Sequence, residues 1–192
     1  MQMKATIGFR VKSGWAAVVL VARAGRSLQA LDTRTIDLCD PAIAETRQPY
    51  HAGMGKLQTN EAILERRKKV IVQAANQSVS RLLNDYRAVG HAIQGAGLVV
   101  GSDIDPAKVA SPHIRAHALE GRLFRTVLED ALQSNGLSCL VIVEKTAYVT
   151  AAKSLKRTEA ELKRVVSEMG RSLIGPWRAD EKTAALAAWL AL

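Results

Sequence analysis

The chain of 192 residues is long enough for one domain with a sizeable core and short for two. Hydrophobic residues make up 48% and charged residues 23%, and 27 Lys and Arg against 18 Asp and Glu give a net charge of +9. This basic balance favours a polyanionic partner, either nucleic acid or a small phosphorylated ligand. Aromatic residues are only 4%, which argues against a stacking platform for single strands.

Membrane insertion and secretion are not expected. The longest apolar run, WAAVVLVA, has eight residues, too few to cross a bilayer. The first residues, MQMKATIGFR, lack the apolar stretch of a secretory signal, so we expect a cytoplasmic protein without membrane contact. Cys39 and Cys139 form no CxxC motif, which argues against a thiolate zinc site.

The amino-terminal part predicts three consecutive antiparallel strands. ATIGFRV (5–11) and GWAAVVLVAR (14–23) are β-branched and apolar, and a short glycine-containing turn between them predicts a hairpin. A second turn leads into a third strand within SLQALDTRTIDL (27–38). The following segment, 39–58, has no clean period, and loops of that length are usually functional or disordered. Its candidate residues are Tyr50 and His51.

The middle of the chain predicts helix, strand and helix. A long helix should run from Thr59 or Asn60 to about residue 88, with Arg66 and Lys69 as a candidate stripe for phosphate contacts on its outer side. AGLVVGSD (96–103) predicts a buried fourth strand that ends near Asp103. Ser111 as N-cap, followed by proline, begins the next helix.

The carboxy-terminal part predicts a fifth strand and two helices. LSCLVIVEK (137–145) is continuously apolar and should be buried on both faces of a sheet. The capping box TEAE at 158–161 begins a helix that reaches about residue 173, and Asp180 can cap the last helix. We therefore expect one domain that spans residues 1–192.

This order of elements resembles the ribonuclease H-like superfold, which includes Holliday-junction resolvases, transposases and actin-like ATPases. Three stretches carry the resemblance: IGFRVKSGWAAVVLV in the opening hairpin, GLVVGSD in the fourth strand and DEKTAALAAW in the last helix. The resemblance implies an α/β fold with a five-stranded mixed sheet, three antiparallel strands and then two further strands, flanked by helices. It extends over nearly the whole chain by element order.

The resemblance also implies acidic metal ligands, and here the sequence departs from the pattern. Resolvase-like members place their first metal-binding aspartate at the position that Arg10 occupies, and an arginine cannot ligate Mg²⁺. Asp103 matches the acidic position at the end of the fourth strand, and Asp180 or Glu181 matches the closing helix. We therefore expect a divergent member that lacks the ordinary nuclease centre and that, if it is an enzyme, is a hydrolase.

The helix after Ser111 carries polar residues on its apolar stripe. Its second half places Phe124, Val127 and Leu128 on one face, and the same face continues backwards through Glu120, His117 and His113. Open α/β sheets bind ligands where strand ends and helix starts meet, so the first turns of this helix should face a cleft. The residues expected to converge there are Arg10, Lys12, Ser13, Asp103, His113, His117, Glu120 and Lys145.

This cleft has several possible uses. Two histidines four residues apart can chelate a divalent metal, with Asp103 as a further ligand. They can also serve acid–base chemistry or bind an anion together with Arg10 or Lys12. The simplest alternative is that Glu120 satisfies both imidazoles at the edge of the core. The candidate catalytic set is Asp103, His113, His117, Glu120 and Asp180, and the candidate binding set is Arg10, Lys12, Ser13 and Lys145.

Three functions remain open from the sequence. The first is a ribonuclease H-like protein that binds nucleic acid or another polyanion with an altered or lost nuclease centre. The second is an enzyme or binding protein for a small anionic metabolite, held by Arg10, Lys12, His113 and His117. The third is an interaction module, a homodimer in which the two histidines contact the partner chain.

Overall fold

The computed structural model of the protein describes residues 3–25 and 27–192. Its main sheet has five strands in the order β3-β2-β1-β6-β7, where β1 and β2 form the opening hairpin and β3 continues it. Strands β6 and β7 run parallel to β1. The expected mixed sheet is thus confirmed; its strands are β1 (Met3–Lys12), β2 (Trp15–Ala24), β3 (Ser27–Asp37), β6 (His91–Val100) and β7 (Cys139–Val143).

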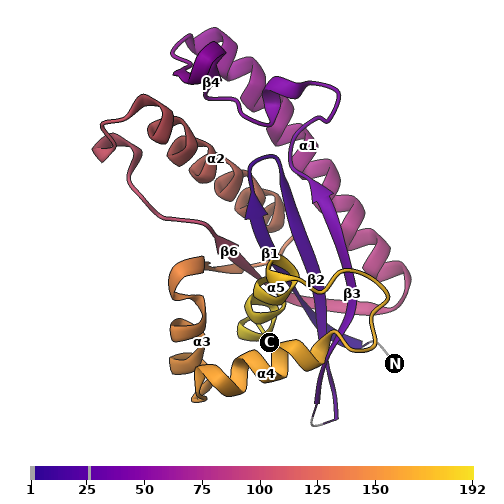
Figure 1. Cartoon of the computed structure of the whole chain (residues 1–192). Helices are drawn as coiled ribbons and strands as arrows, with labels where there is room; N and C mark the ends of the chain where they lie inside the picture. Colours follow the sequence, from indigo (N-terminus) through magenta and orange to yellow (C-terminus); the bar gives the residue numbers. More distant parts are fainter. Residues whose placement is uncertain (1–2, 26) are drawn as a thin grey trace.

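Helices cover both faces of the sheet. The long helices α1 (Glu61–Ala88) and α2 (Pro112–Ser134) share one core with the sheet. On the other face, a second core holds α3 (Ala147–Leu155), α4 (Glu159–Met169) and α5 (Ala179–Leu190), as Figure 1 shows. Within the described part of the chain, no helix is long and apolar enough to cross a membrane.

The segment between β3 and α1 is ordered by short elements. A 3-10 turn, η1 (Ala44–Thr46), is followed by a two-stranded hairpin of β4 (His51–Ala52) and β5 (Lys56–Leu57), which are joined by η2 (Gly53–Gly55). Two further 3-10 turns, η3 (Pro106–Lys108) and η4 (Glu144–Thr146), follow β6 and β7. The long loop expected from the sequence therefore contains a hairpin that packs on α2.

Strand β1 divides its side chains between the two cores. Ile7, Phe9 and Val11 belong to the core beneath α1 and α2. The alternating residues lie toward α5, where the Thr6 hydroxyl donates a hydrogen bond of 2.7 Å to the carbonyl of Ala188. Because side chains alternate along a strand, Arg10 and Lys12 extend toward the same side as Thr6.

Helix α5 lies unusually close to the sheet. A Cβ atom added at Gly8 would overlap the carbonyl oxygen of Ala184, and one added at Gly97 would overlap that of Ala187. Both glycines lie on the central strands, so the helix backbone rests directly on the sheet backbone. The position of α5, and of every side chain at its beginning, depends on this contact.

Three sequence predictions need correction. Helix α3 was not expected between the fifth strand and the capping box, and the helix from that box ends at Met169 rather than near residue 173. In addition, the fourth strand of the sheet, β6, begins at His91, five residues before the run that predicted it. The capping box is present as expected, because the Thr158 side chain accepts from the backbone of Glu161 and Glu161 accepts from the backbone of Thr158.

We predict that Gly97→Ala lowers the free energy of unfolding by at least about 3 kcal/mol, because the added methyl group forces α5 off the sheet. The matched control is Gly121→Ala in α2, where an added Cβ meets no atom within 4 Å. That control should raise the free energy of unfolding by up to about 1 kcal/mol, the usual gain for alanine in a helix interior. Urea unfolding followed by circular dichroism measures both; equal midpoints for the two variants would contradict the close packing.

Candidate functional site

The three parallel strands end at one edge of the sheet. Arg10 of β1 is in register with Val99 of β6, which is in register with Ile142 of β7. The residues that follow these three positions therefore gather at the same rim. This is the place at which open α/β sheets bind ligands.

Arg10 is the centre of an ion-pair cluster at this rim. The residue is only 3% exposed, and its guanidinium contacts both carboxylate oxygens of Glu144, with 3.1 Å between Nε and Oε1. A further guanidinium nitrogen donates to the carbonyl of Val11 at 2.7 Å. Asp180 of α5 lies 3.8 Å from Arg10 Nε. The Arg10 guanidinium is thus held by the Glu144 carboxylate and the Val11 carbonyl, with the Asp180 carboxylate nearby.

Lys12 completes the cluster, with its amino group 2.9 Å from Asp180 Oδ1. Asp180 lies in the first turn of α5, where the helix dipole favours a negative charge. The ion-pair cluster of Arg10, Lys12, Glu144 and Asp180 is therefore balanced, with two cations and two anions. The neighbouring Glu181 serves a different purpose, because its carboxylate accepts a 2.8 Å hydrogen bond from the backbone of Arg178 at the start of α5.

On the α2 side of the rim, three histidines form a second cluster. His113 and His117 come from the first turns of α2, and His51 comes from β4. His51 Nε2 lies 3.3 Å from His113 Nδ1, and the ring centroid of His117 lies 4.6 Å from those of both other rings, tilted against His51 and edge-on to His113. One ring nitrogen from each residue lies within 4.8 Å of the other two. We refer to these three residues as the histidine cluster.

Glu120 lies beneath the histidine cluster and is fully buried. Its Oε1 is 2.8 Å from His51 Nδ1 and accepts a 3.3 Å hydrogen bond from the backbone of Tyr50. Within the described part of the chain its Oε2 has no hydrogen-bond partner, and His117 Nδ1 lies 3.5 Å from it. Among the described residues, no lysine or arginine lies within ion-pair distance of this carboxylate.

The β4–β5 hairpin is fixed where it delivers His51. Arg67 of α1 donates from Nη1 to the carbonyls of Pro49 and His51, at 2.7 and 3.3 Å. The backbone of Gln58 donates to the Tyr50 carbonyl at 2.8 Å, which closes the base of the hairpin. Gly55 at the hairpin turn has a positive φ of 73° and passes close to His113 Nδ1. The hairpin is therefore held from α1 and lies over the beginning of α2.

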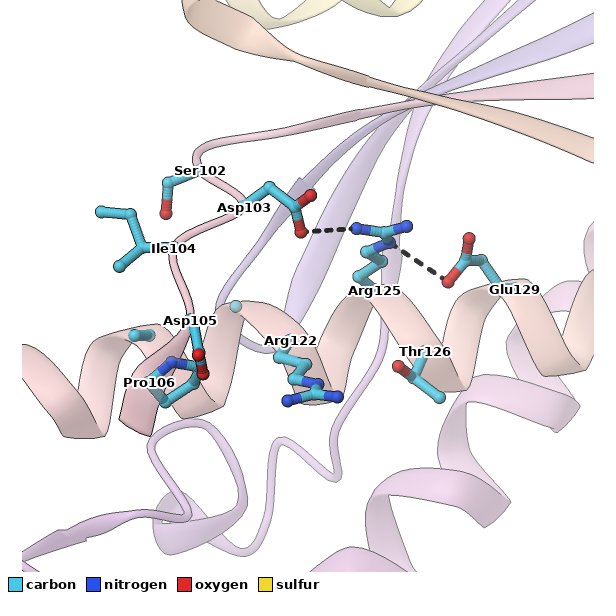
Figure 2. A pocket seen from close by; sticks show the side chains of 11 residues that line it. Ser102, Asp103, Ile104, Asp105, Pro106, Arg122, Arg125, Thr126 and Glu129 are labelled. Atoms are coloured by element: carbon cyan, nitrogen blue, oxygen red, sulfur yellow. Dashed lines mark hydrogen bonds and ion pairs between the residues drawn. The ribbon is translucent and has the colours of Figure 1, made fainter. Parts of the chain in front are cut away.

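Asp103 does not join the histidines, contrary to the expected convergence. It lies in the loop after β6, its side chain is 70% exposed, and its carboxylate accepts a 2.9 Å hydrogen bond from Arg125. Arg125 also contacts Glu129, so that Asp103, Arg125 and Glu129 form a chain along one wall of an open pocket of about 550 Å³ (Figure 2).

The remaining predicted residues lie at the rim with different roles. Ser13 is in the β1–β2 turn and lines a smaller pocket of about 200 Å³ together with Arg10, Lys12 and His117. Lys145 is exposed in η4, and its neighbour Glu144, which the sequence did not single out, makes the contact with Arg10. The sequence indicates His51 only as a candidate within a long loop, and Asp180 lies on the α5 side rather than among the histidines.

Burial disfavours a catalytic thiolate at both cysteines. Burial raises the pKa of the Cys39 thiol and that of the Cys139 thiol above the ordinary value. A raised pKa lowers the thiolate fraction near neutral pH, and the thiolate is the nucleophilic form. The site chemistry therefore rests on the ion-pair cluster and the histidine cluster.

Comparison with solved structures identifies the fold. The chain is similar to a Thermus thermophilus RuvC structure at 11% identity, which covers 97% of this chain and 92% of that one with a TM-score of 0.57. It is also similar to T. thermophilus RuvC in complex with a Holliday junction substrate, at 10% identity, 99% and 92% coverage and a TM-score of 0.55. No protein-family model matches the sequence, and no curated protein matches it either. The chain thus has a ribonuclease H-like fold, as the resemblance implied.

We predict that Glu144→Gln lowers the free energy of unfolding by about 1–3 kcal/mol, because it removes the main counter-charge of a buried arginine. The value lies below that of a fully buried pair since the Glu144 side chain is 43% exposed. Glu159→Gln is the control: it breaks an exposed pair with Lys163 on α4, 3.6 Å apart, and should cost less than about 0.5 kcal/mol. If chemical unfolding gives equal losses of unfolding free energy for the two variants, the Arg10–Glu144 pair stabilises the fold no more than an exposed ion pair does.

Proposed function

We propose that this protein binds nucleic acid on a ribonuclease H-like fold without cutting it, because an ion-pair cluster replaces the metal-dependent nuclease centre. The observation that carries the proposal is the buried Arg10 at the end of β1, held by Glu144 and close to Asp180. The rim still has acidic residues, but the carboxylates of Glu144 and Asp180 are each paired with an arginine or lysine of the same chain.

The donor set does not fit the metal ions that the fold family implies. Mg²⁺ requires oxygen ligands, and a two-metal centre needs several carboxylates free to share the ions. Here Arg10 supplies a positive charge at the position of the first acidic ligand. Lys12 forms an ion pair with Asp180, with 2.9 Å between its amino nitrogen and Oδ1. Asp103, the remaining acidic candidate, points to Arg125. We therefore derive no hydrolytic step through such ions.

Charge supports the nucleic-acid part of the proposal. The chain has a net charge of +9, and polyanion binding by lysine and arginine is the electrostatic part of nucleic-acid recognition. Arg66 and Lys69 are exposed on α1, the helix beside α2 in Figure 1. A structural neighbour was solved with a Holliday junction substrate, so branched DNA is the first substrate to test.

A small anionic metabolite is less well supported as the ligand. That alternative depends on Arg10 and Lys12 as free cations at the rim, and both are paired with carboxylates. The pocket that they line is about 200 Å³, below the usual size range of ligand pockets. Neutralised cations in a small pocket leave little charge for a phosphorylated compound.

We predict that the protein binds branched DNA with strong salt dependence and does not cleave it in Mg²⁺ or Mn²⁺. The double variant Arg66→Glu/Lys69→Glu should weaken binding at least tenfold and lower the salt slope by about 2, since each phosphate contact contributes roughly 0.9 to the slope. Fluorescence anisotropy over a salt series, on four-way, duplex and single-stranded DNA and on RNA, gives both quantities. Gel analysis of the same mixtures detects cleavage.

The matched control reverses two charges on the opposite side of the sheet. Arg164→Glu/Arg171→Glu changes the net charge equally at exposed positions in and just after α4. It should alter binding by less than about threefold if α1 makes the phosphate contacts. Metal-dependent cutting by the wild-type protein would overturn the lost-centre proposal, and absence of binding at low salt would overturn the nucleic-acid proposal.

A further inference from the structure

The geometry points to a transition-metal site, of the kind that takes Zn²⁺, built by the histidine cluster and oriented by Glu120. It is independent of the proposed nucleic-acid function, because it uses neither Arg10 nor the cations of α1. The ligands would be one ring nitrogen each from His51, His113 and His117, which lie within 4.8 Å of one another. Imidazole nitrogen is a preferred ligand of Zn²⁺ and related metals.

The spacing of the nitrogens agrees with a tetrahedral ion. Zn–N bonds of about 2.0–2.1 Å place two ligand atoms of a tetrahedron about 3.3–3.4 Å apart. His51 Nε2 and His113 Nδ1 are separated by 3.3 Å. The Nδ1 atom of His117 is directed to Glu120 at 3.5 Å, which leaves its Nε2 as the atom for the metal. The three ligand nitrogens lie within 4.8 Å of one another, so His117 would have to move closer to the other two rings to complete a tetrahedral site.

Glu120 has the features of an outer partner of a metal site. Ligating histidines commonly donate their second ring nitrogen to a carboxylate, which fixes the ring and increases its basicity. Glu120 Oε1 lies 2.8 Å from His51 Nδ1, and its Oε2 lies 3.5 Å from His117 Nδ1 with no hydrogen-bond partner among the described residues. One carboxylate can therefore orient two of the three ligands.

Charge gives an independent reason for a bound cation. A fully buried carboxylate is costly unless a positive charge lies close to it, and no lysine or arginine among the described residues is within ion-pair distance of Glu120. A divalent cation held by one ring nitrogen from each histidine would lie beside this carboxylate and supply a compensating charge.

The site would be open on one side. His113 and His117 are exposed, and the His117 side chain retains 46% of its accessible surface. His117 also lines the pocket of about 200 Å³ at the end of β1. Three protein ligands with the fourth position left for water or another ligand is the coordination found in catalytic rather than structural zinc sites.

The test is Zn²⁺ titration of the chelator-treated protein by calorimetry, with Co²⁺ as a spectroscopic probe of tetrahedral coordination. One ion per chain is expected, together with the visible absorption of tetrahedral Co²⁺ and a rise in Tm on adding Zn²⁺. His113→Ala and His117→Ala should each weaken Zn²⁺ binding at least about 100-fold, and Glu120→Gln about 10–100-fold. Both histidines are exposed, so their loss leaves the core intact even if Glu120→Gln fails to fold.

The matched control is His91→Ala, because His91 is the one of the four histidines that lies outside the cluster, in β6. This variant should bind Zn²⁺ with the wild-type affinity and stoichiometry. Absence of stoichiometric Zn²⁺ binding by the wild type would overturn the proposal. Equal losses in His91→Ala and His113→Ala would overturn it as well, since binding would then be adventitious.

Discussion

Close packing of α5 against the central strands is the constraint on which the ion-pair cluster depends. Gly8 and Gly97 have no side chain to hold the helix away, and the Thr6 hydroxyl binds the helix carbonyl of Ala188. This contact sets the height of the helix above β1 and β6, and its first turn then meets the end of β1. Asp180 reaches Lys12 and Arg10 for that reason, so a backbone contact in the core determines the charge pattern at the rim.

Most of the fold can be predicted from the sequence because its signals are local. The glycine turns, the apolar runs of β6 and β7, and the caps at Ser111 and Thr158 each act within a few residues of the element that they begin or end. Strand β7 is not buried on both faces as expected, because it is an edge strand in which only Ile142 is buried. Helix α3 escapes prediction because it lacks such signals. Thr146 makes no side-chain cap, and the helix ends at Lys156 with a φ of 52°, where glycine would be the usual marker.

The site can be predicted only in part, because tertiary contacts assemble it. Helical periodicity was enough to place His113, His117 and Glu120 on one stripe, since all three belong to α2. His51 lies 69 residues from Glu120, and Glu144 lies 134 residues from Arg10, so no spacing in the sequence connects them. For Asp103 the sequence prediction is wrong although the signal is local. The residue follows β6 closely, as expected, but its carboxylate pairs with Arg125 in a different pocket.

The ion-pair cluster and the histidine cluster lie at the same rim of the sheet but differ in how they would interact with a divalent cation. On the side of α5, Arg10 and Lys12 neutralise the carboxylates, and a divalent cation placed there would meet positive charge. On the side of α2, the buried Glu120 has only imidazoles beside it, and a divalent cation there would complete its charge balance. The carboxylates on the α5 side are thus already paired with cations, whereas the histidines on the α2 side offer ring nitrogens to a metal ion. A likeness of fold identifies where ligands gather, and the charges that each face presents decide which ligand can bind.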